Sequence, residues 1–270
     1  MDISQKVKQT LSKINLNKRD KILVALSGGK DSAVTAYLLH KFGYNIEGLH
    51  IDLKMGKYSS DCLEAVRKLC GELGIKLYVY DIRKEMGNSM CNIRQSIQSQ
   101  SKNSIKNCAI CGVIKKWILN KEARRLKTDY IATGHHLDDE IQTFMLNILK
   151  GSPELSANSG AITKNIPDKK FIPRLKPLFY IPETEIKKYA ITHKLPVVYE
   201  KCPCAIDSYR IQIREFMKNL SDKQKENLIK NAEELIKKIE KNNNKINYCE
   251  ICGEPARGKI CKMCEMLKSN

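Results

Sequence analysis

Large aromatic residues and long apolar runs are both scarce in this chain, which has one Trp and five Phe among 270 residues. No run approaches the ~18 apolar residues that a membrane-spanning helix needs. The first residues, MDISQKVKQTLSKINLNKRDK, lack the apolar centre of a secretory signal peptide. These absences exclude a membrane bundle, and we expect a cytoplasmic protein that makes no membrane contact.

Acidic residues are also few, because 30 Asp and Glu face 48 Lys and Arg, giving a net charge of +18 and a pI near 9.4. Hydrophobic residues make up 42% and charged residues 29% of the chain, which is ordinary globular usage and excludes wholesale disorder. The basic balance favours a polyanionic partner such as nucleic acid.

Cysteine is abundant but unevenly placed, with 11 residues in total and none in residues 1–20. An odd number in a reducing compartment argues against a disulfide framework. Most of the cysteines fall in clusters, which indicates metal binding. We interpret the scattered Cys62, Cys70 and Cys91 as buried structural thiols.

Apolar runs suited to buried strands alternate with helical segments along most of the chain. The alternation predicts an α/β protein with a Rossmann-like parallel sheet covered by helices. We divide the chain into an N-terminal helix (1–20), a catalytic body (21–245) and a metal-binding tail (246–270). The expected strands lie at 21–26, 46–52, 76–81 and 129–134, with a further short strand at PVVY (196–199).

Helices are expected after each of the first strands, over about 59–73 and 183–193, and across 208–245. The polar segment between Asp81 and Cys108 is interpreted as a mobile loop or weak helix, and 151–182, with five Pro, as an irregular connection.

The segment SGGKDS follows the first strand and opens a helix. Its glycines allow close backbone approach, and the N–H groups at the helix start can hold an anion. The spacing matches neither a Walker A loop nor G-x-G-x-x-G. The hydroxyls at both ends and the internal Lys-Asp pair favour a phosphate site over an ordinary turn. The predicted nucleotide-binding residues here are Ala25, Ser27, Gly28, Gly29, Lys30, Asp31 and Ser32, joined by Ile51 on the next strand.

A second polar segment, GHHLDDE, follows the strand at 129–134 and begins another helix. Carboxylates at the carboxyl edge of a sheet, beside a triphosphate, indicate Mg²⁺. Helix capping would explain one Asp but not the whole cluster. We therefore add Gly134 and Asp138 to the nucleotide site and favour Asp139 over Asp138 as the carboxylate that binds Mg²⁺.

Cys108 and Cys111 lie three residues apart at the start of a helical run, with Lys115 one turn further on the same face. Cys202 and Cys204 form the other non-terminal pair, and C-x-C geometry hinders both from binding one ion. Cys108, Cys111 and one cysteine of this second pair would form a three-thiolate set, which would bind three irons of a [4Fe–4S] cluster and leave the fourth iron open. A zinc site, a persulfide-carrying pair or structural thiols are the alternatives, and both Cys202 and Cys204 are candidates for the third ligand.

The tail contains two C-x-x-C pairs separated by eight residues, a spacing typical of a closed tetrahedral zinc site. Because so short and polar a segment has no core of its own, zinc would supply its folding energy. The predicted ligands are Cys249, Cys252, Cys261 and Cys264.

The combination of SGGKDS, C-x-x-C, GH-x-x-D-D and a later single Cys resembles the tRNA 2-thiolation family, the TtcA/TtuA-like PP-loop ATP pyrophosphatases, over residues 20–264. The resemblance implies ATP, Mg²⁺ and a [4Fe–4S] cluster on Cys108, Cys111 and Cys202 as cofactors, and it implies catalytic roles for Lys115 and Asp139. TtuA-like enzymes share the zinc tail but carry an additional amino-terminal finger, which this sequence does not show in residues 1–20.

The function expected from this resemblance is an ATP-dependent tRNA 2-thiouridine synthetase. ATP would adenylate the C2 oxygen of a uridine, and sulfur held on the open iron would replace that oxygen. The zinc tail favours a T-loop target, uridine 54. Thiolation of anticodon uridine 34 or cytidine 32, or a lysidine-type ligase on the same scaffold, are alternatives. Expected partners are tRNA, sulfide or a thiocarboxylated carrier protein, and a second copy in a homodimer.

Overall fold

The computed structural model describes residues 2–100, 105–157, 159–163, 168, 170–204, 210–238 and 247–268. Within this part, the strands form a parallel sheet in the order β3-β2-β1-β4-β5 and a small antiparallel pair, β6-β7. The strand bounds are β1 Lys21–Ala25, β2 Asn45–Asp52, β3 Leu77–Asp81, β4 Tyr130–Ala132, β5 Arg174–Leu175, β6 Asn247–Tyr248 and β7 Pro255–Ala256.

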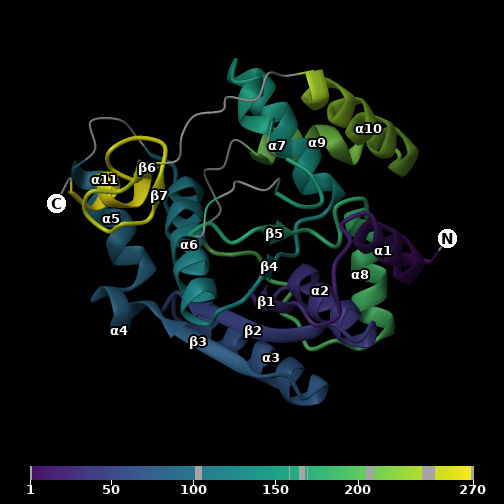
Figure 1. The fold of residues 1–270 in the computed structure, drawn as a ribbon, viewed down its shortest axis with the longest axis horizontal. Helices are drawn as coiled ribbons and strands as arrows, with labels where there is room; N and C mark the ends of the chain where they lie inside the picture. Colours follow the sequence, from purple (N-terminus) through teal and green to yellow (C-terminus); the bar gives the residue numbers. More distant parts are fainter. Residues whose placement is uncertain are drawn as a thin grey trace.

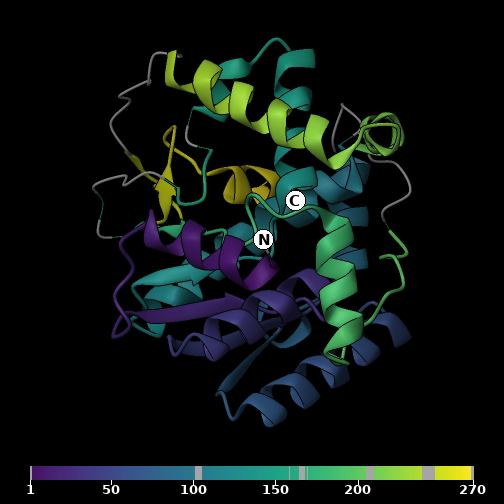
Figure 2. The same cartoon turned by 90° about the vertical axis from the view of Figure 1, so that its right-hand side faces the viewer.

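Helices cover both faces of the parallel sheet (Figures 1 and 2). In this part of the chain their bounds are α1 Ile3–Ser12, α2 Lys30–Lys41, α3 Lys57–Leu73, α4 Ile82–Met86, α5 Met90–Gln100, α6 Asn107–Arg125, α7 Leu137–Leu149, the 3₁₀ turn η1 Pro153–Ser156, α8 Glu183–Thr192, α9 Arg210–Lys218, α10 Asp222–Lys238 and α11 Lys262–Lys268.

The alternation of side chains along β1 divides the hydrophobic interior into two cores. Ile22 and Val24 lie in the core shared with α1, α2, α3 and α8. Leu23 points to the opposite face, into the core shared with α5, α6 and the C-terminal segment. Each fully buried side chain of this kind contributes roughly 1.5–3 kcal/mol. The parallel α/β fold expected from the sequence is therefore confirmed.

The order in which strands are added to the sheet reverses after β3, because β4 pairs with the other side of β1. Five described helices and two strands separate these two neighbours in sequence. Open α/β sheets bind ligands at the carboxyl ends of strands beside such a switch point. The chain leaves β1 into α2 and leaves β4 into α7. The two polar segments singled out in the sequence are thus brought together at this edge.

The segment between Asp81 and Cys108 differs from the expectation of a mobile loop or weak helix. It contains α4 and α5, and α5 buries Met90, Ile93 and Ile97 in the core on the α6 side of the sheet. These three residues repeat at helical spacing, so burial of one face outweighs the polar composition. The prediction of a loop was wrong for this stretch.

Two further expectations also need correction. PVVY is not a strand; Val198 N instead donates a 2.8 Å hydrogen bond to the Gly28 carbonyl, which ties this segment to the glycine turn. The stretch 151–182 is not wholly irregular, because Arg174–Leu175 forms β5 and pairs with β4. The described part of 208–245 is helical as expected, and it divides into two helices because the chain turns at Ser221, whose hydroxyl accepts a hydrogen bond from Gln224 N at the start of α10.

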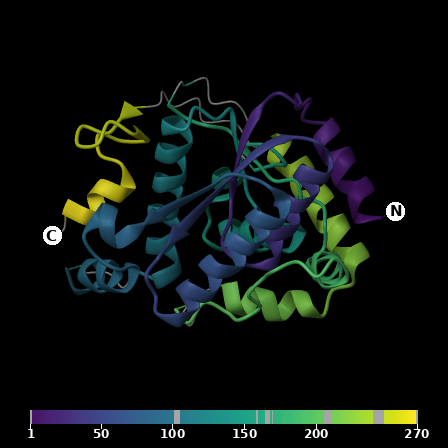
Figure 3. The same ribbon diagram turned by 90° about the horizontal axis from the view of Figure 1, so that it is seen from below.

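The C-terminal segment folds as a small knuckle that packs against α6, while α7, α9 and α10 share a separate core (Figures 1 and 3). The predicted boundary near residue 246 lies outside the described residues. Within the described part, no helix is both long and apolar enough to cross a bilayer.

Candidate functional site

The SGGKDS turn forms a cradle at the end of β1. Gly28 has φ +88°, and a Cβ added there would lie 2.7–2.9 Å from Cys62 atoms of α3, so only glycine fits. Ser32 Oγ accepts a 3.1 Å hydrogen bond from Ser27 N and lies 3.2 Å from Ser27 Oγ. Gly29 is the N-cap of α2, so free N–H groups and the positive helix end face the turn. This arrangement suits a bound phosphate.

The second segment lies directly against this turn. A Cβ added to Gly134 would lie 2.7 Å from the carbonyl carbon of Asp31 and from Ser32 N. His136 caps the N-terminus of α7, in the same way that Gly29 caps α2. Two helix N-termini therefore flank one site, and the absence of a side chain at Gly134 permits their close approach.

Three carboxylates lie within 4 Å of the His136 ring, from Asp31 of the glycine turn and from Asp138 and Asp139 of the second segment. His136 Nε2 lies 3.9 Å from Asp31 Oδ1 and 3.4 Å from Asp139 Oδ2. Burial raises the pKa of the Asp31 carboxyl, and the nearby charge of Asp139 raises it further, against the lowering effects of His136 and Lys30. Carboxylates that repel each other beside a phosphate cradle fit a divalent cation such as Mg²⁺. Sequence reasoning did not assign His136 this central position.

Lys30 and Asp138, both predicted to bind the nucleotide, also hold structural contacts. Lys30 Nζ forms ion pairs with Asp31 at 3.0 Å and with Glu183 of α8 at 2.7 Å. Asp138 is buried, accepts a 2.8 Å hydrogen bond from Glu183 N and pairs with Lys225 of α10 at 2.8 Å. Asp138 therefore joins three helices behind the site, which leaves Asp139 as the carboxylate nearer the cradle.

We predict that Lys225→Met lowers the free energy of unfolding by about 3–5 kcal/mol, because the Asp138 carboxylate would stay buried without its cation. Lys223→Met, at an exposed position of the same helix, is the matched control and should change stability by about 0.5 kcal/mol or less. Urea unfolding of both variants at neutral pH measures the difference. Equal stabilities would contradict the structural role of the pair.

A pocket opens between the carboxyl ends of β1 and β2, the start of α3 and the middle of α6. Ala25, Ser27 and Ile51, all predicted to bind the nucleotide, line it together with Lys115 and Cys202. The nucleotide residues and part of the cysteine set thus face one space. The remaining lining residues are Leu26, Leu49, His50, Leu53, Met55, Tyr58, Ser59, Cys62 and Leu119.

Cys62 and Tyr58 were not expected at this site. Burial raises the pKa of both groups, and a hydrogen bond between them raises the pKa of Tyr58 further. Their place in the pocket follows from the packing of α3 against the glycine turn, a tertiary contact for which the sequence shows no local signal.

One side of α6 carries Cys108, Cys111 and Lys115, while its other side is anchored in the core. Ile110, Ile114 and Ile118 are fully buried and fix the rotation of the helix. Cys108 is exposed in the first turn and Cys111 is half-buried. Lys115, one turn beyond Cys111, lines the pocket, whereas Cys108 and Cys111 are not among its lining residues.

The structure separates the two cysteines of the KCPC segment. Cys202 lines the pocket with Lys115. Cys204 instead accepts a 2.8 Å hydrogen bond from Arg94 Nη2 of α5. This division favours Cys202 over Cys204 as the partner of Cys108 and Cys111. A cubane cluster binds each cysteine through a different iron, so its ligands can come from separated segments such as these.

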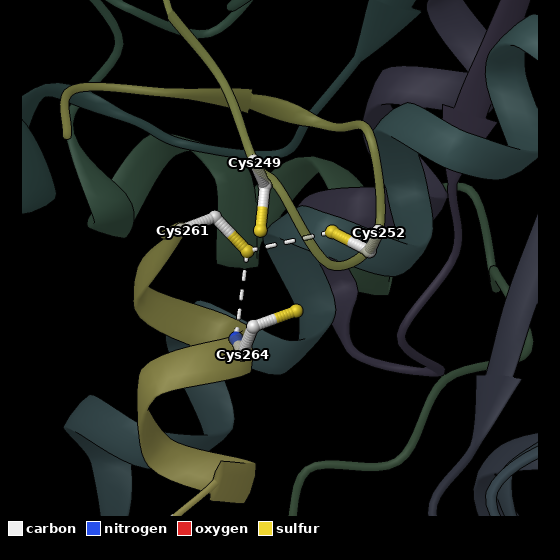
Figure 4. A group of neighbouring side chains, drawn as sticks. All are labelled: Cys249, Cys252, Cys261 and Cys264. Atoms are coloured by element: carbon white, nitrogen blue, oxygen red, sulfur yellow. Dashed lines mark hydrogen bonds between the residues drawn. The ribbon is translucent and has the colours of Figure 1, made fainter. Parts of the chain in front are cut away.

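The four tail cysteines form a compact group (Figure 4). Their Sγ atoms all lie within 4.8 Å of one another, and the Cys252 and Cys261 sulfurs are 3.6 Å apart. A tetrahedral site with Zn–S bonds of ~2.3 Å requires sulfurs about 3.8 Å apart, so the group fits zinc. Burial raises the pKa of Cys249, but hydrogen bonds from backbone N–H groups outweigh it and lower that pKa to about 6, which favours the thiolate.

Buried polar contacts join this knuckle to α6. Glu254 accepts hydrogen bonds from both terminal nitrogens of Arg124 and a 3.2 Å hydrogen bond from Asn120 Nδ2. Cys249, Cys261 and Cys264 lie in the same apolar core as the buried face of α6. The knuckle therefore supports the helix that carries the candidate cluster ligands.

The fold and this edge site define an α/β protein of the nucleotide-binding type. A PP-loop domain family model matches residues 1–220. The tRNA-5-methyluridine(54) 2-sulfurtransferase of Pyrococcus horikoshii is 36% identical over 268 residues, covering 97% of this chain and 83% of the relative. The enzyme of the same name from Thermus thermophilus is 28% identical, covering 92% and 76%.

A solved structure also shows similarity to a tRNA thiolation enzyme. The U34-tRNA thiolase NcsA from Methanococcus maripaludis, solved with its [4Fe–4S] cluster, superimposes with a TM-score of 0.82 at 30% identity, covering 98% of this chain and 86% of that one. The chain therefore belongs to the PP-loop domain family, in its tRNA 2-thiolation branch.

Proposed function

We propose that this protein is an ATP-dependent tRNA 2-thiouridine synthetase that adenylates the uridine C2 oxygen and replaces it with sulfur. One observation carries the proposal: Ser27 of the SGGKDS turn, Lys115 and Cys202 line a single pocket. Activation by ATP and delivery of sulfur must meet at one carbon atom, and this pocket brings the residues for both steps together.

The chemical problem is that a carbonyl oxygen is a poor leaving group. Transfer of AMP to the uridine C2 oxygen converts it into a phosphate ester, and pyrophosphate is released. The N–H groups at the start of α2, with Ser27 and Ser32, would hold the β and γ phosphates. Asp31 and Asp139 would bind the accompanying Mg²⁺, which neutralises the charge of the departing pyrophosphate.

Lys115 would contribute to both steps of the reaction, adenylation of the base and attack by sulfur. Its ammonium group lines the pocket with Ser27 and Cys202 and would stabilise negative charge that develops on the C2 oxygen and the α phosphate. Attack of sulfur on C2 then releases AMP. Asp139 would assist activation of the base from the start of α7.

Cys108, Cys111 and Cys202 would hold a [4Fe–4S] cluster at the pocket mouth. Such a cluster, bound by three cysteines, supplies sulfide as the nucleophile without a net redox change. Cys249, Cys252, Cys261 and Cys264 would hold structural Zn²⁺. The proposal further includes sulfide or a thiocarboxylated carrier as sulfur source, a homodimer, and a cytoplasmic location.

The preferred target is uridine 54 of the T loop, because two of the similar proteins carry that position in their names. Uridine 34 is the second candidate, since the structurally similar NcsA is a U34 thiolase. The two are separated by tRNA transcripts in which only U54 or only U34 is replaced by cytidine. We expect the transcript without U54 to lose thiolation and the transcript without U34 to keep it. The opposite result would move the target to the anticodon.

The contact between the two loops gives a direct test of the nucleotide site. Gly134→Ala places a methyl group 2.7 Å from the backbone of Asp31 and Ser32 and must push the loops apart. Since a misplacement of ~1 Å can cost on the order of 100-fold in rate, we expect tRNA-dependent AMP formation to fall about that much.

The matched control is Gly71→Ala on α3, where an added Cβ meets no atom within 4 Å. This change should leave AMP formation unchanged and raise helix stability by about 0.5–1 kcal/mol. Equal AMP formation by the Gly134 and Gly71 variants would show that the two loops do not form one nucleotide site.

A further inference from the structure

Two further thiols, Cys91 and Cys204, lie beside one buried arginine. Arg94 of α5 is 6% exposed, and its Nη2 atom donates hydrogen bonds to Cys204 Sγ at 2.8 Å and to Cys91 Sγ at 3.2 Å. Both thiols therefore lie beside the same nitrogen atom. Cys91 is one turn before Arg94 on α5, whereas Cys204 comes from the distant segment that carries Cys202.

The arginine is held in place and charged. Its Nε donates a 3.3 Å hydrogen bond to the Met90 carbonyl, which fixes the guanidinium group against its own helix. Burial lowers the pKa of Arg94, but the hydrogen bonds and charges of Cys204 and Cys91 outweigh that effect and raise it. A guanidinium group remains protonated in proteins, so this site supplies a fixed positive charge beside two sulfur atoms.

This pair of thiols is connected to the pocket on two sides. Met90 N donates a 3.1 Å hydrogen bond to the carbonyl of Leu53, and Leu53 lines the pocket. Cys204 follows two residues after Cys202, and Cys202 also lines the pocket. Both thiols are half-buried rather than sealed in the core. Sulfur released here would therefore appear next to the place where the thiolation reaction needs it.

We infer that Cys204 and Cys91, bridged by Arg94, form a sulfur-receiving site that takes sulfane sulfur from a persulfide donor and releases it as sulfide beside Cys202. The inference rests on the proposed function and names a class of sulfur donor for it. The Arg94 N–H groups would stabilise negative charge on a terminal persulfide sulfur in the same way that they now contact the thiols.

The chemistry balances in three steps. Cys204 displaces a thiol R–SH from the donor R–S–SH and becomes Cys204–S–SH. Cys91 then attacks the inner sulfur, forming a Cys91–Cys204 disulfide and expelling H₂S. Two equivalents of a low-molecular-weight thiol reduce the disulfide and are themselves oxidised to one disulfide. The sulfane sulfur gains two electrons, and these come from the thiol.

The first test maps the sulfur on the full-length, anaerobically reconstituted protein. Glutathione persulfide is added, thiols are alkylated and the peptides are analysed by mass spectrometry. We expect a Cys91–Cys204 disulfide and released sulfide from the wild type, and one extra sulfur atom retained on Cys204 in Cys91→Ser. Extra sulfur found equally on Cys108, Cys111 and Cys202, with no Cys91–Cys204 disulfide, would overturn the inference.

The second test compares sulfur sources in tRNA thiolation. In Cys204→Ser and Arg94→Gln, the rate with glutathione persulfide divided by the rate with free sulfide should fall about tenfold or more relative to the wild type. Cys70→Ala, which removes a core thiol of α3, is the control and should keep the wild-type ratio. An unchanged ratio in Cys204→Ser would overturn the inference. Failure of the wild type with both sulfur sources would contradict the proposed function instead, and the peptide mapping would still decide the role of Cys204.

Discussion

Cys202→Ala is expected to lose the iron–sulfur cluster and, with it, tRNA thiolation. Of the two cysteines in the KCPC segment, Cys202 lines the pocket with Lys115, whereas Cys204 contacts Arg94. Changing groups that only orient metal ligands costs 10–100-fold, so removing a ligand should reduce thiolation by more than about 100-fold. ATP binding should persist, because the SGGKDS turn is unchanged. Iron analysis and visible absorbance measure the cluster, mass spectrometry of tRNA nucleosides measures thiolation, and calorimetry with MgATP measures ATP binding.

Cys204→Ala is the matched control for cluster content, since it removes a thiol two residues away in the same segment. It should retain iron and the visible absorbance of the cluster after anaerobic reconstitution. Iron lost from Cys204→Ala and kept by Cys202→Ala would reverse the assignment of the third ligand.

Removal of zinc from the C-terminal knuckle is expected to destabilise α6. It would thereby disturb the pocket that α6 lines, although no knuckle residue lines that pocket. Apparent binding energies of structural zinc are ~10–16 kcal/mol in small domains, so the knuckle should unfold without it. Its unfolding would release Glu254 from Arg124 and Asn120 and uncover the apolar side of α6. Hydrogen exchange after chelation, or in Cys252→Ala, should accelerate in α6 and stay slow in α2, which lies in the other core.

Two cations, one on α6 and one in the knuckle, allow a milder version of this test. Arg124→Ala leaves the buried Glu254 carboxylate without its main partner and should cost about 3–5 kcal/mol. Lys262 pairs with Glu265 on its own helix, and both side chains are exposed, so Lys262→Ala should cost at most about 1 kcal/mol. Unchanged exchange in α6 after zinc loss, together with equal stabilities of the two variants, would show that the knuckle does not support the helix.

Strands β1 to β4 and the nucleotide turn could be predicted from local sequence because each depends on short-range pattern, whereas β5 lies in a stretch expected to be an irregular connection. KILVAL reads as a buried strand, and a Gly-rich turn followed by a helical run specifies β1, the turn and α2 in order. The approach of Gly134 to Asp31 was expected only in outline, from the rule that carboxyl ends of parallel strands share one edge.

Other features depend on tertiary contacts and could not be predicted. The polar composition of α5 concealed Met90, Ile93 and Ile97 at helical spacing, so the residue Arg94 was missed with it. PVVY has strand composition, yet its backbone binds Gly28 and forms no ladder. Sequence spacing also left Cys202 and Cys204 undistinguished, because only the position of α5 separates a thiol that faces the pocket from one that faces an arginine.

One pocket of this protein is proposed to activate a tRNA base with ATP and then to exchange its oxygen for sulfur. The direct test incubates the anaerobically reconstituted protein with unmodified tRNA, MgATP and sulfide, followed by nuclease digestion and mass spectrometry of the nucleosides. We predict 2-thiouridine or its 5-methyl form, with AMP and pyrophosphate produced in equal amounts. AMP formation without any thiolated nucleoside would contradict the sulfur-transfer half of the account and leave an adenylating enzyme with another nucleophile.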